Sequence, residues 1–77
     1  MKTKSTRRLR FENVAAKRTQ KILNYLDSLS KCANRTNYEY DEEDIKKMFR
    51  AIKDQVNNCE GQYNNELKKK SKNQFKF

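Results

Sequence analysis

The chain has 77 residues, of which 34% are hydrophobic and 38% charged, and its net charge is +9. This length allows one small domain at most, and this composition lies close to that of disordered chains and of helical assemblies. One Gly and no Pro favour helices over tightly turned sheets.

The N-terminal part predicts a basic arm followed by a first helix. Residues 1–8 carry four basic side chains and almost no apolar ones, so we expect a flexible arm there. From 9 to 32 apolar residues recur at helical spacing, which predicts a helix with a narrow apolar face. The members of its two heptad rows are Ala15, Ile22 and Leu29, and Thr19, Leu26 and Ala33.

The segment 33–41 predicts a turn between two helices. Asp41 is suited to be the N-cap of the second helix, with Asp44 at the position where a capping box usually has Glu or Gln. Tyr40 and Ile45 occupy the two positions of a hydrophobic staple. Asn34 is suited to the left-handed conformation that ends many helices.

The second helix is predicted over 42–70 and is the more regular of the two. Gly61 interrupts its pattern, and the sequence leaves open whether the helix continues past that residue. Residues 71–77 are predicted to form a basic tail. The two heptad rows are Ile45, Ile52 and Cys59, and Phe49, Val56 and Tyr63.

These elements predict an all-α fold, an antiparallel two-helix hairpin (9–70) with a basic arm and a basic tail. A hairpin buries too little surface for a robust monomer, so we expect a helical bundle completed by a homodimer or by docking onto a partner. Cys32 would lie beside the turn and Cys59 about 18 residues, or about 27 Å, beyond it. A disulfide needs α-carbons within about 7 Å, so we expect reduced, partly buried thiols.

The positive charge is concentrated at the two ends of the chain. Residues 1–21 have a net charge of +7, residues 22–66 of −3, and residues 67–77 of +5. A hairpin would bring both ends to one basic pole, which suits a polyanion such as nucleic acid, although lysine-rich ends can also serve only for solvation. The predicted nucleic-acid-binding residues are Arg7, Arg8, Arg10, Lys17, Arg18, Lys21, Lys68, Lys69, Lys70 and Lys72.

Recognition of particular bases has less support in the sequence, which carries no known nucleic-acid-binding signature. We therefore predict contacts to phosphate and to shape, made by Arg and Lys. The aromatic candidates for stacking on bases are Tyr38, Tyr40, Phe75 and Phe77.

The residue types that serve most catalytic sites are missing. The chain has no His, the common general base near neutral pH, and no Gly-rich phosphate loop. Two Cys without His do not form a zinc set. We predict a non-enzyme with no cofactor and no metal. The chain also has no apolar run of membrane-spanning length, so we expect a cytoplasmic protein with no membrane contact.

Several segments carry a family resemblance: Arg18-Thr19 with Lys21, Asn34-Arg35, Tyr38-Glu39-Tyr40, Glu43-Asp44-Ile45, Lys47-Met48-Phe49 and Ala51-Ile52. Through them the chain resembles small α-helical proteins of Gram-positive mobile elements, which are plasmids, conjugative elements and phages. The resemblance implies a mobile-element context and brings no functional residues.

Two functions remain open from the sequence. One is an accessory protein that binds nucleic acid or a ribonucleoprotein through its basic pole. The alternative is a protein-interaction module, such as an inhibitor that docks on a nucleic-acid-guided defence complex of the CRISPR type.

Overall fold

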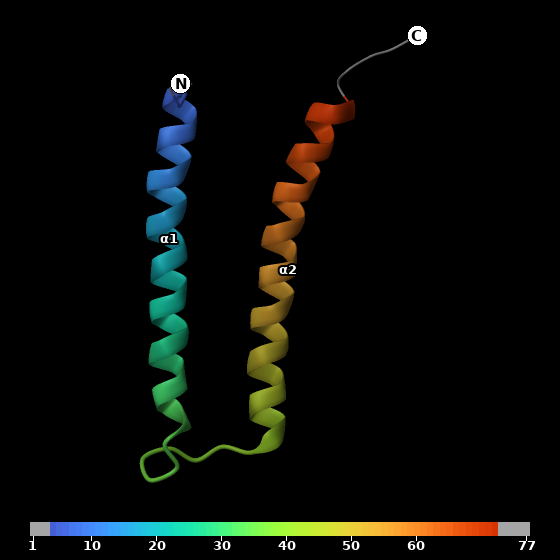
Figure 1. Ribbon diagram of the computed structural model, residues 1–77. Helices are drawn as coiled ribbons and strands as arrows, with labels where there is room; N and C mark the ends of the chain where they lie inside the picture. The colour runs from blue at the N-terminus through green and yellow to red at the C-terminus, as the bar shows by residue number, and fades with distance from the viewer. Residues whose placement is uncertain (1–3, 73–77) are drawn as a thin grey trace. The chain divides into compact units, whose positions relative to one another are not determined.

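The structure, a computed structural model, describes residues 4–72, and the side chains of residues 4–69. Its elements are α1 (Thr6–Ser30), the 3-10 turn η1 (Lys31–Ala33) and α2 (Glu42–Lys72). The described residues contain no strand, so the all-helical class is confirmed. The chain divides into two compact units, Met1–Glu39 and Tyr40–Phe77, and each unit is described by itself. Both helices are labelled in Figure 1.

α1 begins earlier than the predicted residue 9, because the chain supplies a cap ahead of it. Ser5 is the N-cap, and its hydroxyl oxygen accepts a bond from the backbone N–H of Arg8 at 3.1 Å. The backbone N–H of Leu9 bonds to the Ser5 carbonyl oxygen at 3.0 Å. The predicted arm 1–8 is therefore shortened, and Arg7 and Arg8 belong to the first turn of α1.

α1 ends in the 3-10 turn, and Asn34 does not take the predicted left-handed conformation. Its φ is −66° and its ψ is 105°, which is extended backbone. Its side-chain oxygen instead accepts a bond from the backbone N–H of Thr36 at 3.0 Å, and its carbonyl oxygen accepts one from Tyr38 at 3.0 Å. The Asn side chain thus closes a local turn, which satisfies the backbone without a positive φ.

α2 begins at the predicted residue, with the predicted cap. The Asp41 side chain accepts from the backbone N–H of Asp44 at 2.9 Å, and the Asp44 side chain accepts from that of Asp41 at 3.0 Å. The two aspartates therefore complete a reciprocal capping box, although Asp44 is shorter than the usual Glu or Gln. Tyr40 and Ile45 are both half-buried.

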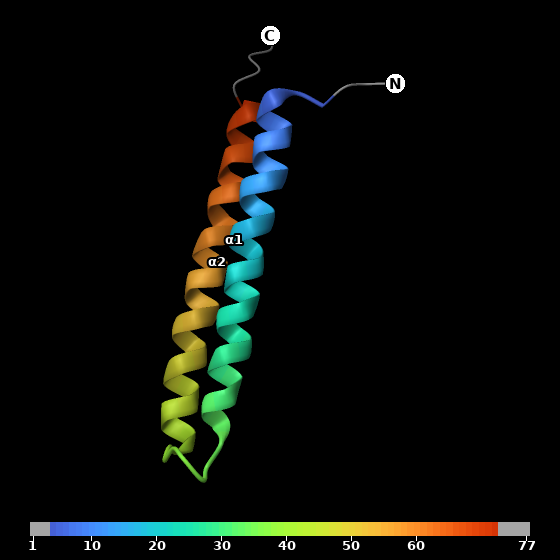
Figure 2. The same cartoon turned by 90° about the vertical axis from the view of Figure 1, so that its left-hand side faces the viewer.

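α2 continues through Gly61 to Lys72, so the helix is two residues longer than predicted and its end lies within the predicted tail 71–77. Figures 1 and 2 show α2 as one uninterrupted helix. Residues 73–77 of that tail lie outside the described residues. Gly61 lies on the polar side of α2, about 160° around the helix from Ile45 and Tyr63. A Cβ atom at Gly61 would meet nothing within 4 Å.

The heptad-row residues of each helix follow one face, as predicted. The half-buried members of these rows are Ala15 and Leu29 on α1 and Ile45 and Ile52 on α2. No described side chain is fully buried. The helices are therefore formed by local hydrogen bonds and caps, and their apolar faces remain available for further burial.

Candidate nucleic-acid interface

Five cations of α1 lie on one side of the helix. Successive residues are about 100° apart around an α-helix, and these five fall within an arc of about 100°. All five are exposed, and the arc extends about 21 Å along the axis at about 1.5 Å per residue. We call this set the α1 cation stripe: Arg7, Arg10, Lys17, Arg18 and Lys21.

No carboxylate lies within the arc of the stripe. The other residues of α1 in that arc are Val14, Tyr25 and Ser28. Asp27 lies on another side of the helix, with an oxygen 3.9 Å from the Lys31 Nζ atom. None of the five stripe cations forms an ion pair with another described residue. Their positive charge is therefore free to meet an external anion.

Arg8 was predicted with the stripe residues, but the structure separates it from them. Its Nε atom donates to a carboxylate oxygen of Glu12 at 3.0 Å, and the Lys4 Nζ atom lies 2.9 Å from the same carboxylate. The Arg8 guanidinium also lies 5.5 Å from the centre of the Phe11 ring. Arg8 therefore has its charge partly satisfied within the chain, on a different side of α1.

The pKa of Glu12 reflects this arrangement. The hydrogen bond from Lys4 is the largest cause and lowers its pKa below the usual 4.5; desolvation, the next largest, opposes it, and the bond from Arg8 lowers the pKa further. Glu12 is thus the anion that compensates two N-terminal cations, and the remaining cations of α1 have no such compensation.

The predicted cations at the end of α2 are arranged differently. Lys68 and Lys69 are neighbours and therefore point about 100° apart, and the Lys69 Nζ atom lies 3.5 Å from a Glu66 oxygen. Lys70 and Lys72 lie in the last turns of α2, and their side chains are outside the described ones. Cations at a helix C-terminus stabilise the helix through its dipole, which already explains these lysines.

At the N-terminus of α1 the relation to the dipole is the opposite. The first turn of α1 contains no acidic residue and carries Arg7 and Arg8, where the positive end of the dipole disfavours cations. Ser5 caps the helix but adds no negative charge. One stripe cation, Arg7, is therefore placed where it costs helix stability.

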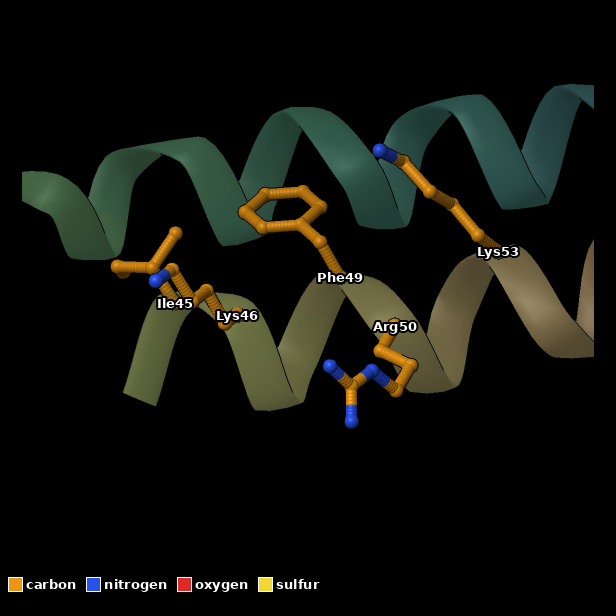
Figure 3. A pocket seen from close by; sticks show the side chains of 5 residues that line it. All are labelled: Ile45, Lys46, Phe49, Arg50 and Lys53. Atoms are coloured by element: carbon orange, nitrogen blue, oxygen red, sulfur yellow. The ribbon is translucent and has the colours of Figure 1, made fainter. Parts of the chain in front are cut away.

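A shallow depression on α2 is a second surface feature. Ile45, Phe49 and Lys53 project from one side of the helix, one turn apart, and Arg50 projects from another side (Figure 3). Lys46 completes the lining. The depression thus combines an apolar row with three cations. The apolar row continues along the helix with exposed Val56, Tyr63 and Leu67.

Both thiols are free, as predicted, but the prediction of partial burial is wrong. Cys32 lies in η1 and Cys59 on the apolar face of α2, and both are exposed. No group of three metal-ligating side chains occurs among the residues that the structure describes. Nor does the described part contain a helix of the length and apolarity that a bilayer crossing requires.

Two features of α1 were not recognised in the sequence. The first feature is the pair of ion pairs that Lys4 and Arg8 form with Glu12. The ion pair of Arg8 could have been predicted, because Arg8 and Glu12 are four residues apart in a helix. The second feature is Tyr25, an aromatic residue of α1 that has 77% of its surface exposed.

The aromatic residues predicted for stacking lie elsewhere. Tyr38 is exposed in the loop, Tyr40 is half-buried next to the α2 cap, and Phe75 and Phe77 are outside the described residues.

No protein-family model, no curated protein and no solved structure shows a significant match to the chain.

Proposed function

We propose that the chain is a small nucleic-acid-binding protein whose α1 cation stripe binds the phosphate backbone of nucleic acid, free or within a nucleoprotein. The stripe itself carries the proposal, because its five exposed cations share one side of α1 without a carboxylate. Binding of this kind releases counterions from the nucleic acid and depends strongly on salt. The partner is a nucleic-acid strand, and no base-specific contact is required.

The position of Arg7 supports a binding role over simple solvation. Lysines at the end of α2 stabilise their helix through the dipole, whereas Arg7 of the stripe occupies the unfavourable first turn of α1. Cations needed only for solvation would be placed with less cost elsewhere on the surface.

We further propose that α1 and α2 pair antiparallel through their apolar faces, which would bring both basic ends to one pole. The support is the apolar row on each helix together with the lack of a fully buried side chain among the described residues. A second copy or a docked partner would bury the remaining apolar surface. Sedimentation of nuclease-treated protein distinguishes a homodimer from a monomer.

The proposed phosphate binding is tested with two triple variants of equal charge change. Arg10→Gln, Lys17→Gln and Lys21→Gln together remove three stripe cations from α1. Arg50→Gln, Lys46→Gln and Lys53→Gln together remove one Arg and two Lys from α2, and serve as the matched control. Fluorescence anisotropy with a labelled oligonucleotide at two salt concentrations measures the affinity of each. The stripe variant should bind about 100-fold more weakly than the control at low salt, at about 1 kcal/mol for each of the three lost contacts. Equal affinities would contradict the proposal.

A protein-interaction module is the second candidate function, for example an inhibitor that docks on a nucleic-acid-guided defence complex. The depression on α2 favours it, because exposed Phe49 lies among the cations Lys46, Arg50 and Lys53 (Figure 3). Such a surface suits an acidic protein partner. Capture of one defined protein after nuclease treatment, lost in the α2 triple variant and kept in the α1 triple variant, would support this candidate.

A further inference from the structure

Tyr25 is an exposed aromatic residue within a helix. Its exposed fraction of 77% is the largest among the large apolar side chains of the described part. By comparison, Leu26 and Leu29 of the same helix are 39% exposed and half-buried, respectively. The Tyr25 ring therefore does not pack on the apolar face of α1, and most of its surface is open to a ligand.

Tyr25 also continues the α1 cation stripe. It follows Arg18 by seven residues and Lys21 by four, so it lies within about 40° of both around the helix axis. The rise from Lys21 to Tyr25 is about 6 Å, which is one turn. A strand whose phosphates lie along the stripe therefore reaches Tyr25 directly after Lys21.

We propose that Tyr25 is a base-stacking residue and that the stripe takes single-stranded nucleic acid; this inference rests on the proposed function. Cations that follow a backbone and an aromatic side chain that stacks on a base are the two components of binding to unpaired strands. A duplex keeps its base faces stacked inside the helix, so Tyr25 would add nothing to duplex binding.

The phosphate and base chemistry that this surface recognises is shared by DNA and RNA. Binding to labelled oligothymidine and to labelled oligouridine, each of about twelve nucleotides, compares single-stranded DNA with RNA. A duplex of the same length compares single-stranded with double-stranded nucleic acid. Similar affinity for both single strands is expected, because no described feature of the stripe selects the 2′-hydroxyl group.

The test replaces the ring while it keeps the helix. Tyr25→Ala and Tyr25→Leu should each lower single-strand affinity about 5- to 10-fold, and Tyr25→Phe should keep it within about 2-fold. Duplex affinity should stay unchanged in all three. Tyr63→Ala is the matched control, because Tyr63 is a helical tyrosine that is 54% exposed but lies on α2 and not on the stripe. Far-UV circular dichroism confirms that each variant is folded.

The outcomes separate the inference from the proposed function. If the α1 triple variant loses binding and Tyr25→Ala does not, the stacking role is wrong and phosphate binding by the stripe stands. If Tyr25→Leu binds as the wild type does, the ring acts as an apolar contact and the stacking role is again wrong. If Tyr25→Ala loses single-strand affinity while the α1 triple variant keeps it, stacking stands and phosphate binding by the stripe falls. A wild-type chain that binds neither oligonucleotide overturns both.

Discussion

Arg8 and Arg10 lie two residues apart in α1, but only Arg8 has an anionic partner among the residues that the structure describes. Glu12 accepts a bond from Arg8 at 3.0 Å, whereas Arg10 forms no ion pair with a described residue. We therefore expect Arg10→Gln and Arg8→Gln to differ in their effect on nucleic-acid binding, although both remove one positive charge close to the same helix terminus.

The magnitude follows from the number of phosphates that the stripe can neutralise. Each contact to a single strand contributes about 0.7 to the slope of log affinity against log salt, so five cations predict a slope of about −3.5. Affinity should then fall about 100-fold between about 50 and about 200 mM salt. Arg10→Gln should reduce the slope to about −2.8, and Arg8→Gln should leave it near −3.5, within about 0.3.

The assay is a salt series of fluorescence anisotropy titrations with a labelled single strand. Glu12→Gln is the third variant, because it releases Lys4 and Arg8 from their partner and should steepen the slope by up to about 1.4, at about 0.7 per released cation. Equal slope changes in Arg8→Gln and Arg10→Gln would refute the reasoning, since they would mean that the bonds to Glu12 do not withhold Arg8 from phosphate.

Three further predictions concern the two helices. Gly61→Ala should stabilise the chain by about 0.5–1 kcal/mol in urea denaturation, because an added Cβ meets no atom within 4 Å in the middle of α2; destabilisation would show that a partner approaches this side closely. Asp41→Ala should cost about 1 kcal/mol in the same assay, since it removes the acceptor of the Asp44 N–H bond; no loss would mean that the cap adds nothing. Because the pKa of Glu12 is lowered in the folded chain, its stabilising effect is present above about pH 4.5 and is lost as pH falls through the folded value. Helicity by circular dichroism should thus fall more on acidification in the wild type than in Glu12→Gln, and identical curves would contradict that role.

The start of α2 could be predicted because its signals are local. A cap at Asp41, an acidic first turn and the partner position of Asp44 all lie within four residues, and the structure forms the box they indicate. The start of α1 was placed too late for the converse reason. The apolar pattern starts at Leu9, but the helix starts at the cap Ser5, and contacts over four and eight residues to Glu12 accompany its first turns.

The candidate site could be predicted only in its composition. The charge distribution identified the basic residues of α1, and helical periodicity places most of them on one side. Which of them are already paired depends on side-chain geometry, as Arg8 shows. The role of Gly61 depended on which side of α2 faces solvent, and the exposure of Tyr25 depended on the packing of its neighbours. Neither the side of α2 that faces solvent nor the packing around Tyr25 can be predicted from residue type alone.

The exposed thiols offer a practical route to the arrangement of the chain. Cys32 belongs to the first structural unit and Cys59 to the second, and both are accessible in the native sequence. Nitroxide labels can therefore be attached to both without any substitution, and pulsed electron paramagnetic resonance would measure the distance between them. The antiparallel pairing proposed above predicts a separation of about 27 Å along the helix axis. The same accessibility means that the protein must be handled under reducing conditions, because oxidation would join separate chains covalently and mimic self-association.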